Sequence, residues 1–159
     1  MERMMLMEKD VFAAKVLASE QMLYRISKSI LFYDSDCEDA VQEAIFKAYS
    51  KISQLREERY FTSWLVRILI NECYRINNGK RRETSFEEYM QSEEAEENGV
   101  SELYEAIMKL PEKLRLAVEL HYIEGYSVEE TGEILGIPGG TVKSRLSEGR
   151  KKLRAFLEE

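Results

Sequence analysis

The sequence contains few of the residues that build metal sites or break helices. Its 159 residues include two cysteines, one histidine and two prolines. A zinc site needs about four ligands from Cys, His or acidic side chains, and Cys37 and Cys73 form no CxxC pair. We therefore expect no metal and no cofactor. We interpret both cysteines as small hydrophobic residues on helices and His121 as a structural side chain.

Long apolar runs are also missing. No stretch approaches the roughly 20 residues that a membrane-spanning helix needs, and Met1–Asp10 carries charges where a signal peptide would have an apolar core. The sequence shows no Ser/His/Asp arrangement and no phosphate-binding loop. We expect a cytoplasmic protein that does not insert into membranes, is not an enzyme and has no small-molecule substrate.

Charge is abundant, and its two signs are separated along the chain. The formal net charge is −7, and residues 83–105 contain glutamates but no Lys or Arg. Residues 141–157 carry six basic side chains against one acid, Glu148. This separation indicates different surfaces for different partners. We interpret most of the acidic run as a solvated, extended linker.

Apolar residues recur at helical spacing in the first half of the chain. This spacing predicts helices over Asp10–Leu31, Cys37–Ile52 and Phe61–Ile76. The polar segment Ser53–Tyr60 is predicted to be a loop. Asp34–Asp36 offers N-cap candidates for the second helix, and Asn77–Gly79 is typical of a helix end.

The second half of the sequence predicts shorter helices, joined by few turns. They cover Ser101–Leu110 and a segment that Pro111 opens and that ends at Glu124. Ser127 and Glu130 have the spacing of a capping box, Gly136 suits a left-handed C-cap, and a last helix follows Pro138 to about Leu157. The fold class is therefore all-α, with two small helical domains joined by an acidic linker.

The capped helix, the glycine turn and the basic helix together predict a helix-turn-helix. Gly132 provides the small residue that close packing needs, and Val142 would anchor the second helix. One helix of such a pair lies in a DNA major groove. The simpler alternative is a helical hairpin with a solvated, charged second helix. Candidates for DNA contact on the second helix are Thr141, Lys143, Ser144, Arg145, Ser147, Glu148, Arg150 and Lys151.

Segments in both halves resemble one protein family. The segment from Leu110 through the helix-turn-helix to Leu153 resembles region 4 of the extracytoplasmic-function (ECF) sigma factors of the sigma-70 family. Asp36–Glu43 resembles the acidic signature of region 2, and Phe61–Ile68 with Asn71 resembles the Trp-Leu-x-x-Ile-x-x-Asn signature that follows it. Together the resemblance covers about residues 10–157.

The resemblance implies two domains and a tether. These are region 2 over 1–82, an acidic linker over 83–100 and region 4 over 101–159. It implies binding to core RNA polymerase, through the β′ coiled coil and the β flap, to promoter DNA, and to an anti-sigma factor. Core polymerase would be bound by Asp39, Gln42, Glu43, Phe46 and Lys47. The −10 element would be recognised and melted by Tyr60, Phe61, Trp64, Arg67, Asn71, Arg75, Lys80, Arg81 and Arg82.

Some positions depart from the family pattern or allow two interpretations. Members usually carry Asp and Arg where this chain has Arg75 and Asn78, and many carry Arg-Ala where it has Glu148-Gly149. Trp64 is spaced as a core residue, which we weigh above direct base stacking. A stand-alone helix-turn-helix regulator is the alternative function, and it would bind a palindromic operator without polymerase.

Overall fold

The computed structural model describes residues 8–80 and 85–158, and every regular element in these ranges is a helix. The predicted all-α fold class is confirmed. The chain divides into two compact units, Met1–Gly79 and Lys80–Glu159. Each unit has its own buried residues and is described by itself.

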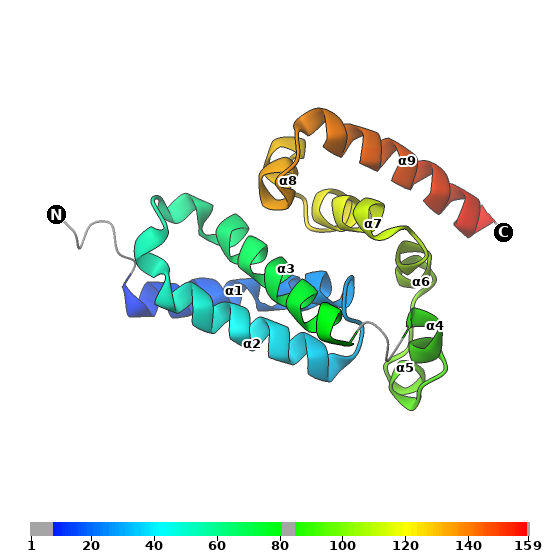
Figure 1. The fold of residues 1–159 in the computed structure, drawn as a ribbon, viewed down its shortest axis with the longest axis horizontal. Helices are drawn as coiled ribbons and strands as arrows, with labels where there is room; N and C mark the ends of the chain where they lie inside the picture. The colour runs from blue at the N-terminus through cyan, green and yellow to red at the C-terminus, as the bar shows by residue number, and fades with distance from the viewer. Residues whose placement is uncertain (1–7, 81–84, 159) are drawn as a thin grey trace. The chain divides into compact units, whose positions relative to one another are not determined.

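The N-terminal unit is built from three long helices and two short 3₁₀ turns (Figure 1). The predicted loop Ser53–Tyr60 contains no α-helix, but it is not fully irregular, because one 3₁₀ turn crosses its start and another forms its end. The elements are α1 (Lys9–Lys28), α2 (Asp34–Ser50), η2 (Ile52–Gln54), η3 (Glu58–Tyr60) and α3 (Phe61–Lys80).

Aromatic rings join these three helices at one end of the unit. The Phe12 ring of α1 meets Tyr49 of α2 edge-on at 5.2 Å between centroids, and Phe61 of α3 at 5.5 Å. Edge-to-face pairs at this separation are favourable beyond the area that they bury. Small and branched side chains complete the core, which includes Leu23, Ile26, Ala40, Ala44, Leu65 and Leu69.

The boundaries of α2 and α3 differ from the prediction. α2 begins at Asp34, and its N-cap residue Tyr33 makes no side-chain cap, so the predicted cap residues lie in the first turn. Carboxylates are stabilised there by the positive end of the helix dipole. The predicted helix end at Asn77–Gly79 is wrong, because α3 continues through Gly79 to Lys80. Gly79 does not adopt the left-handed conformation that ends helices.

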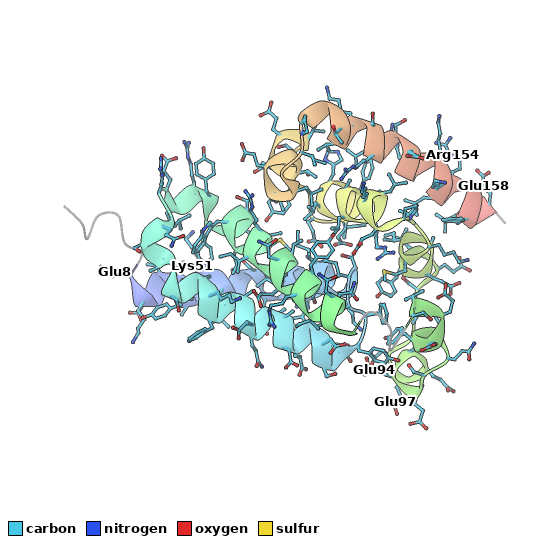
Figure 2. All side chains as sticks on the ribbon, viewed as in Figure 1. Glu8, Lys51, Glu94, Glu97, Arg154 and Glu158 are labelled. Atoms are coloured by element: carbon cyan, nitrogen blue, oxygen red, sulfur yellow. The ribbon has the colours of Figure 1, made fainter. Side chains whose placement is uncertain are left out.

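The acidic segment is helical, not extended as we expected. Ser85 caps α4 (Phe86–Met90) and Ser92 caps α5 (Glu93–Asn98), each through a backbone N–H to Oγ distance of 3.2 Å. Glutamates in both first turns, where the helix dipole favours them, help to explain why so charged a segment forms helices. Figure 2 marks Glu94 and Glu97 on α5.

These short helices belong to the C-terminal unit. The Phe86 ring of α4 contacts Tyr104 edge-on at 5.9 Å, which ties α4 to the next helix. The predicted division into region 2, linker and region 4 stays a prediction. The remaining elements are α6 (Glu102–Met108), α7 (Glu112–Val118), the π-helical turn η4 (Glu119–Ile123), α8 (Val128–Leu135) and α9 (Gly139–Glu158).

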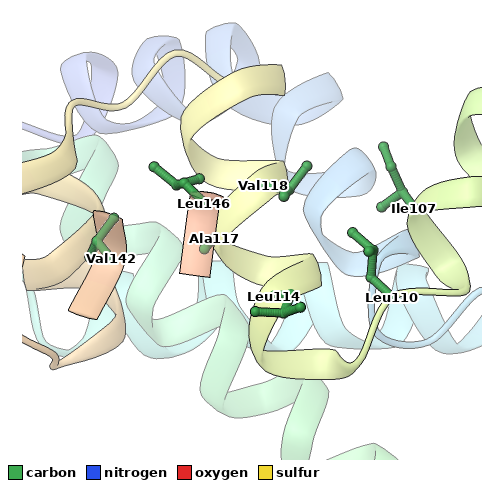
Figure 3. Close-up of a cluster of buried hydrophobic side chains, with 7 residues drawn as sticks. All are labelled: Ile107, Leu110, Leu114, Ala117, Val118, Val142 and Leu146. Atoms are coloured by element: carbon green, nitrogen blue, oxygen red, sulfur yellow. The ribbon is translucent and has the colours of Figure 1, made fainter. Parts of the chain in front are cut away.

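One hydrophobic cluster holds α6, α7 and α9 together (Figure 3). Val142 and Leu146 project from α9 into this cluster and are 0% and 3% exposed. Because both anchors are deeply buried, the orientation of α9 is set by core packing. The other side chains of the cluster are Ile107 of α6, Leu110 of the connection between α6 and α7, and Leu114, Ala117 and Val118 of α7.

Candidate nucleic-acid interface

The predicted helix-turn-helix is present as α8, a turn and α9. Glu130 N donates to Ser127 Oγ at 3.0 Å, and Ser127 N donates to Glu130 Oε1 at 2.8 Å. The predicted capping box is therefore confirmed. Gly136 is left-handed, with φ 71° and ψ 37°, as predicted for the C-cap.

Gly132 explains why the turn can be so tight. Ile137 N donates to Gly132 O at 2.9 Å, and a Cβ built on Gly132 would lie 2.7 Å from Ile137 O. No side chain fits that space without moving the backbone. The predicted requirement for a small residue in the first helix is confirmed.

α9 has a buried face and an exposed polar face. Val142, Leu146 and Gly149 are buried, so the intervening residues are turned toward solvent. A shallow hollow runs along Ser144, Ser147, Glu148, Lys151 and Lys152. Of the predicted DNA contacts, Thr141, Arg145 and Ser147 are half-buried, and Lys143, Ser144, Glu148, Arg150 and Lys151 are exposed.

Gly149 allows close packing between α9 and α7. A Cβ at this position would lie 2.8 Å from Val118 Cγ2 and 4.0 Å from Leu114 Cβ. In the sequence, Gly149 is a departure from the family pattern. The structure gives the physical reason, which is that a methyl group here would collide with the α7 surface.

The π-helical turn η4 supplies contacts that the sequence analysis missed. Arg150 donates to the hydroxyl of Tyr122, a residue of η4. His121 Nδ1 lies 2.7 Å from the Tyr126 carbonyl oxygen, which can only accept. Nδ1 therefore carries a proton, and this bond to the backbone supports the structural role that we predicted for His121. No sequence pattern of ours distinguished this turn from an ordinary helix end.

The polar face of α2 presents most of the residues predicted to bind polymerase. Asp39 and Gln42 are exposed, Glu43 is half-buried, and Phe46 is 66% exposed. An exposed aromatic ring among acidic and amide groups is typical of an interface. Lys47 differs from its neighbours because its ammonium is paired with Glu72 of α3.

The residues predicted for the −10 element are divided between the surface and the core. Tyr60 is 46% exposed, with the Arg59 guanidinium 4.8 Å from its ring centroid. Phe61 is 1% exposed, so its ring has no surface for a base, and we correct its role to core packing. Trp64 is half-buried against Phe61, at 6.2 Å between ring centroids.

Three further predicted residues share one side of α3. Arg67, Asn71 and Arg75 are exposed and follow each other at intervals of four residues, the spacing that aligns side chains on one helix face. The Lys80 side chain, Arg81 and Arg82, which we also predicted to contact DNA, lie outside the described residues. Of the basic surface that we predicted to contact DNA near −10, the structure therefore describes Arg67, Asn71 and Arg75.

Glu72 connects the α2 face to the α3 face, and the sequence analysis missed it. Its side chain is 5% exposed, Lys47 Nζ lies 2.5 Å from Oε2, and Arg75 Nε donates to Oε1 at 2.9 Å. Burial alone would raise the pKa of the Glu72 carboxyl. The hydrogen bonds and charges of Lys47 and Arg75 outweigh burial and lower this pKa below its usual value.

The cysteines are packed in the core of the N-terminal unit. Cys37 and Cys73 are free and buried, as we predicted for small hydrophobic residues. Burial raises the pKa of the Cys37 thiol to about 11 and raises that of Cys73 as well. Neither thiol is ionised near neutral pH, so neither is activated as a nucleophile.

Two absences are observed in residues 8–80 and 85–158. No group of three or more His, Cys, Asp or Glu side chains is arranged to hold a metal ion there. None of the helices in these residues is both long enough and apolar enough to span a bilayer.

Comparison with known proteins places both halves of the chain in one family. The family model for sigma-70 region 2 matches residues 16–83, and the model for sigma-70 region 4 matches residues 101–153. The Bacillus subtilis ECF RNA polymerase sigma factor SigW is 30% identical over 96% of this chain and 91% of its own length. The Escherichia coli K12 sigma-E factor is 33% identical over 74% of this chain and 72% of its own.

Solved structures agree with this assignment. The sigma factor RpoE from Bartonella quintana, in complex with the anti-sigma factor NepR, superposes with a TM-score of 0.76 at 25% identity, over 95% of this chain and 98% of that one. The structure of CnrH with the cytosolic domain of CnrY shares the fold, with a TM-score of 0.75 at 23% identity over 95% and 90%. The chain belongs to the ECF sigma factors of the sigma-70 family.

Proposed function

We propose that this chain binds core RNA polymerase and promoter DNA, and directs initiation by reading a −35 and a −10 element. The observation that carries the proposal is the presence of regions 2 and 4, in order, on one chain. Sigma-70 family members of this type are transcription initiation factors. The chain itself need supply no catalytic group, since the polymerase performs the chemistry in the cytoplasm.

The −35 element is assigned to the exposed face of α9. Lys143 and Ser144 are exposed near the start of this helix, where a recognition helix contacts base edges. Arg145, Arg150 and Lys151 provide charges for phosphates, and Glu148 can accept a hydrogen bond from a cytosine amino group. The exposed basic face beside two buried anchors supports this assignment.

The −10 element and the polymerase are assigned to separate faces of the N-terminal unit. Unstacked bases are offered two aromatic rings, those of Tyr60 and half-buried Trp64. Phosphates are offered hydrogen-bond donors on one side of α3, from Arg67, Asn71 and Arg75. The α2 face with Asp39, Gln42, Glu43 and Phe46 is the proposed polymerase surface. We keep the division into region 2 (1–82), linker (83–100) and region 4 (101–159) as part of this proposal.

An anti-sigma factor is the proposed regulator. The Bartonella quintana relative was solved with the anti-sigma factor NepR, and this chain shares its fold. A protein that covers the exposed faces of both units would prevent polymerase and promoter binding together.

Reconstituted transcription tests the proposal. The full chain should retain core polymerase in a pull-down and direct run-off transcription from promoters found by mapping start sites in cells that express it. A folded chain that does not bind core polymerase would exclude the sigma role. Tight binding to a palindromic operator without polymerase would instead indicate a stand-alone regulator, which the region 2 match does not favour.

A further inference from the structure

The Glu72 carboxylate is buried between two cations that come from different helices. Lys47 reaches it from α2 and Arg75 from the next turn of α3, at 2.5 Å and 2.9 Å. A buried carboxylate is costly unless it is paired and hydrogen-bonded. Both of its oxygens have a partner here, one from each cation, so Glu72 fixes both side chains in place.

Arg75 is held by only one edge of its guanidinium. Nε donates to Glu72, yet the Arg75 side chain remains 60% exposed. Arg67, Asn71 and Arg75 lie about 6 Å apart along α3, since four residues rise by that distance in a helix. Glu72 therefore holds one edge of the Arg75 guanidinium, while most of this side chain remains open to solvent.

This arrangement points to a supporting role in DNA binding. We propose that Glu72 is a positioning residue for the promoter, which holds the Arg75 guanidinium in line with Arg67 and Asn71 so that it contacts a DNA phosphate. The inference rests on the proposed function of the chain. Binding groups whose orientation is fixed by neighbouring hydrogen bonds lose less entropy when the ligand arrives.

The same contacts change the role of Lys47. We first assigned this residue to the polymerase surface, but its ammonium is committed to Glu72. Lys47 is therefore a counter-ion that stabilises the buried carboxylate, and since its side chain is still 36% exposed, its contact with polymerase stays a prediction beside those of Asp39, Gln42, Glu43 and Phe46.

The test measures promoter affinity as a function of salt. Holoenzyme is assembled from core polymerase and the full chain, and binds a fluorescent promoter duplex from a mapped start site. Arg75→Ala removes the proposed phosphate contact, and Glu72→Gln removes the carboxylate that holds Arg75 in place for it. Each should therefore weaken binding about tenfold, the effect of losing one charge-assisted contact. Each should also reduce the slope of log affinity against log salt by about 0.7 to 0.9, the change for one phosphate.

A double-mutant cycle separates positioning from general damage. If Glu72 acts through Arg75, combining Glu72→Gln with Arg75→Ala should cost no more than either change alone. Combining Glu72→Gln with Arg67→Ala should be additive, because the two Glu72 oxygens are paired with Lys47 and Arg75 and not with Arg67. Affinity for core polymerase should stay at the wild-type value throughout.

Two matched variants serve as controls. Asp34 is another ion-paired carboxylate of the N-terminal unit, 2.8 Å from Lys28 Nζ, and Asp34→Asn should leave the salt slope unchanged. Arg75→Lys keeps the positive charge but loses the Nε hydrogen bond and the guanidinium plane. It should weaken promoter binding, and this result stands even if Glu72→Gln fails to fold.

The contrary outcomes are distinct. Tighter promoter binding by Glu72→Gln would mean that its negative charge merely opposes DNA. Additive losses in the Glu72/Arg75 cycle, or wild-type binding by Arg75→Lys, would also overturn the positioning role. If the wild-type holoenzyme does not bind any mapped promoter, the proposed function fails as a whole, which is a separate result.

Discussion

At the residue scale, Glu72 links the stability of the N-terminal unit to pH. Its folded pKa is lowered, while an unfolded glutamate titrates near a pKa of about 4.3. The ion pairs therefore stabilise the fold above that value, and this contribution is lost as pH falls through the lower folded pKa.

We expect Glu72→Gln to lower the free energy of unfolding at pH 7 and to have a smaller effect at pH 3. Trp64 is the single tryptophan of the chain, so its fluorescence during urea unfolding reports on the N-terminal unit. An equal difference between wild type and variant at both pH values would show that the carboxylate charge does not contribute.

Gly132 and Gly149 of the C-terminal unit have no space for a side chain. Gly132→Ala should destabilise the unit by about 2 kcal/mol, because a backbone oxygen 2.7 Å from the new Cβ cannot easily move. Gly140→Ala is the matched control. Its Cβ would meet nothing within 4 Å, so Gly140→Ala should not lower stability, because alanine is favoured over glycine in a helix. Thermal unfolding followed by circular dichroism checks both, and a neutral Gly132→Ala would contradict the packing argument.

At the element scale, local signals predicted the helix-turn-helix well and other elements less well. Ser127 and Glu130 lie within one turn at the start of α8, and Gly136 ends the same helix through its own backbone conformation. Both signals are local, so the sequence alone revealed the N-cap and the C-cap. The π-helical turn at Glu119–Ile123 was not predicted, because helical spacing of apolar residues does not distinguish a π-helical turn from an α-helical one. The helices of the acidic segment were missed because their serine caps and first-turn glutamates were outweighed by the low apolar content. The continuation of α3 was missed because Asn77–Gly79 was interpreted as a helix end, whereas Gly79 is not left-handed.

The exposed face of α9 should control −35 recognition without affecting the polymerase. Lys143→Ala or Ser144→Ala should lower run-off transcription, because each removes a polar group from the predicted groove surface. Binding to core polymerase, measured by pull-down, should persist. Equal loss of core binding would show that these residues act on the assembly of the holoenzyme.

At the scale of the whole molecule, the order of the two halves was predictable, but the contacts that complete each site were not. Signature segments identified both regions in sequence. Phe61, assigned to DNA, is a core residue, and Lys47, assigned to polymerase, pairs with Glu72. Both differences depend on residues distant in sequence, Phe12 and Glu72, which no periodicity connects to them.

Because the chain forms two compact units, their activities should separate. Asp39→Ala combined with Gln42→Ala should weaken core polymerase binding, since both side chains are exposed on the proposed interface. The affinity of the C-terminal unit for a −35 duplex should stay unchanged. We would measure it in the full chain with a duplex that lacks a −10 element, and a shift there would contradict the independence of the two units.

The packing of α9 also has an evolutionary consequence. Residues that fix its orientation, Val142, Leu146 and Gly149, are buried, whereas Lys143, Ser144 and Glu148 touch solvent. Exposed substitutions usually change stability by less than about 0.5 kcal/mol. New promoter preferences can therefore arise by single exchanges on one face of this helix, while selection for folding acts on the other. Paralogues could diverge in the genes that they control and still share one scaffold.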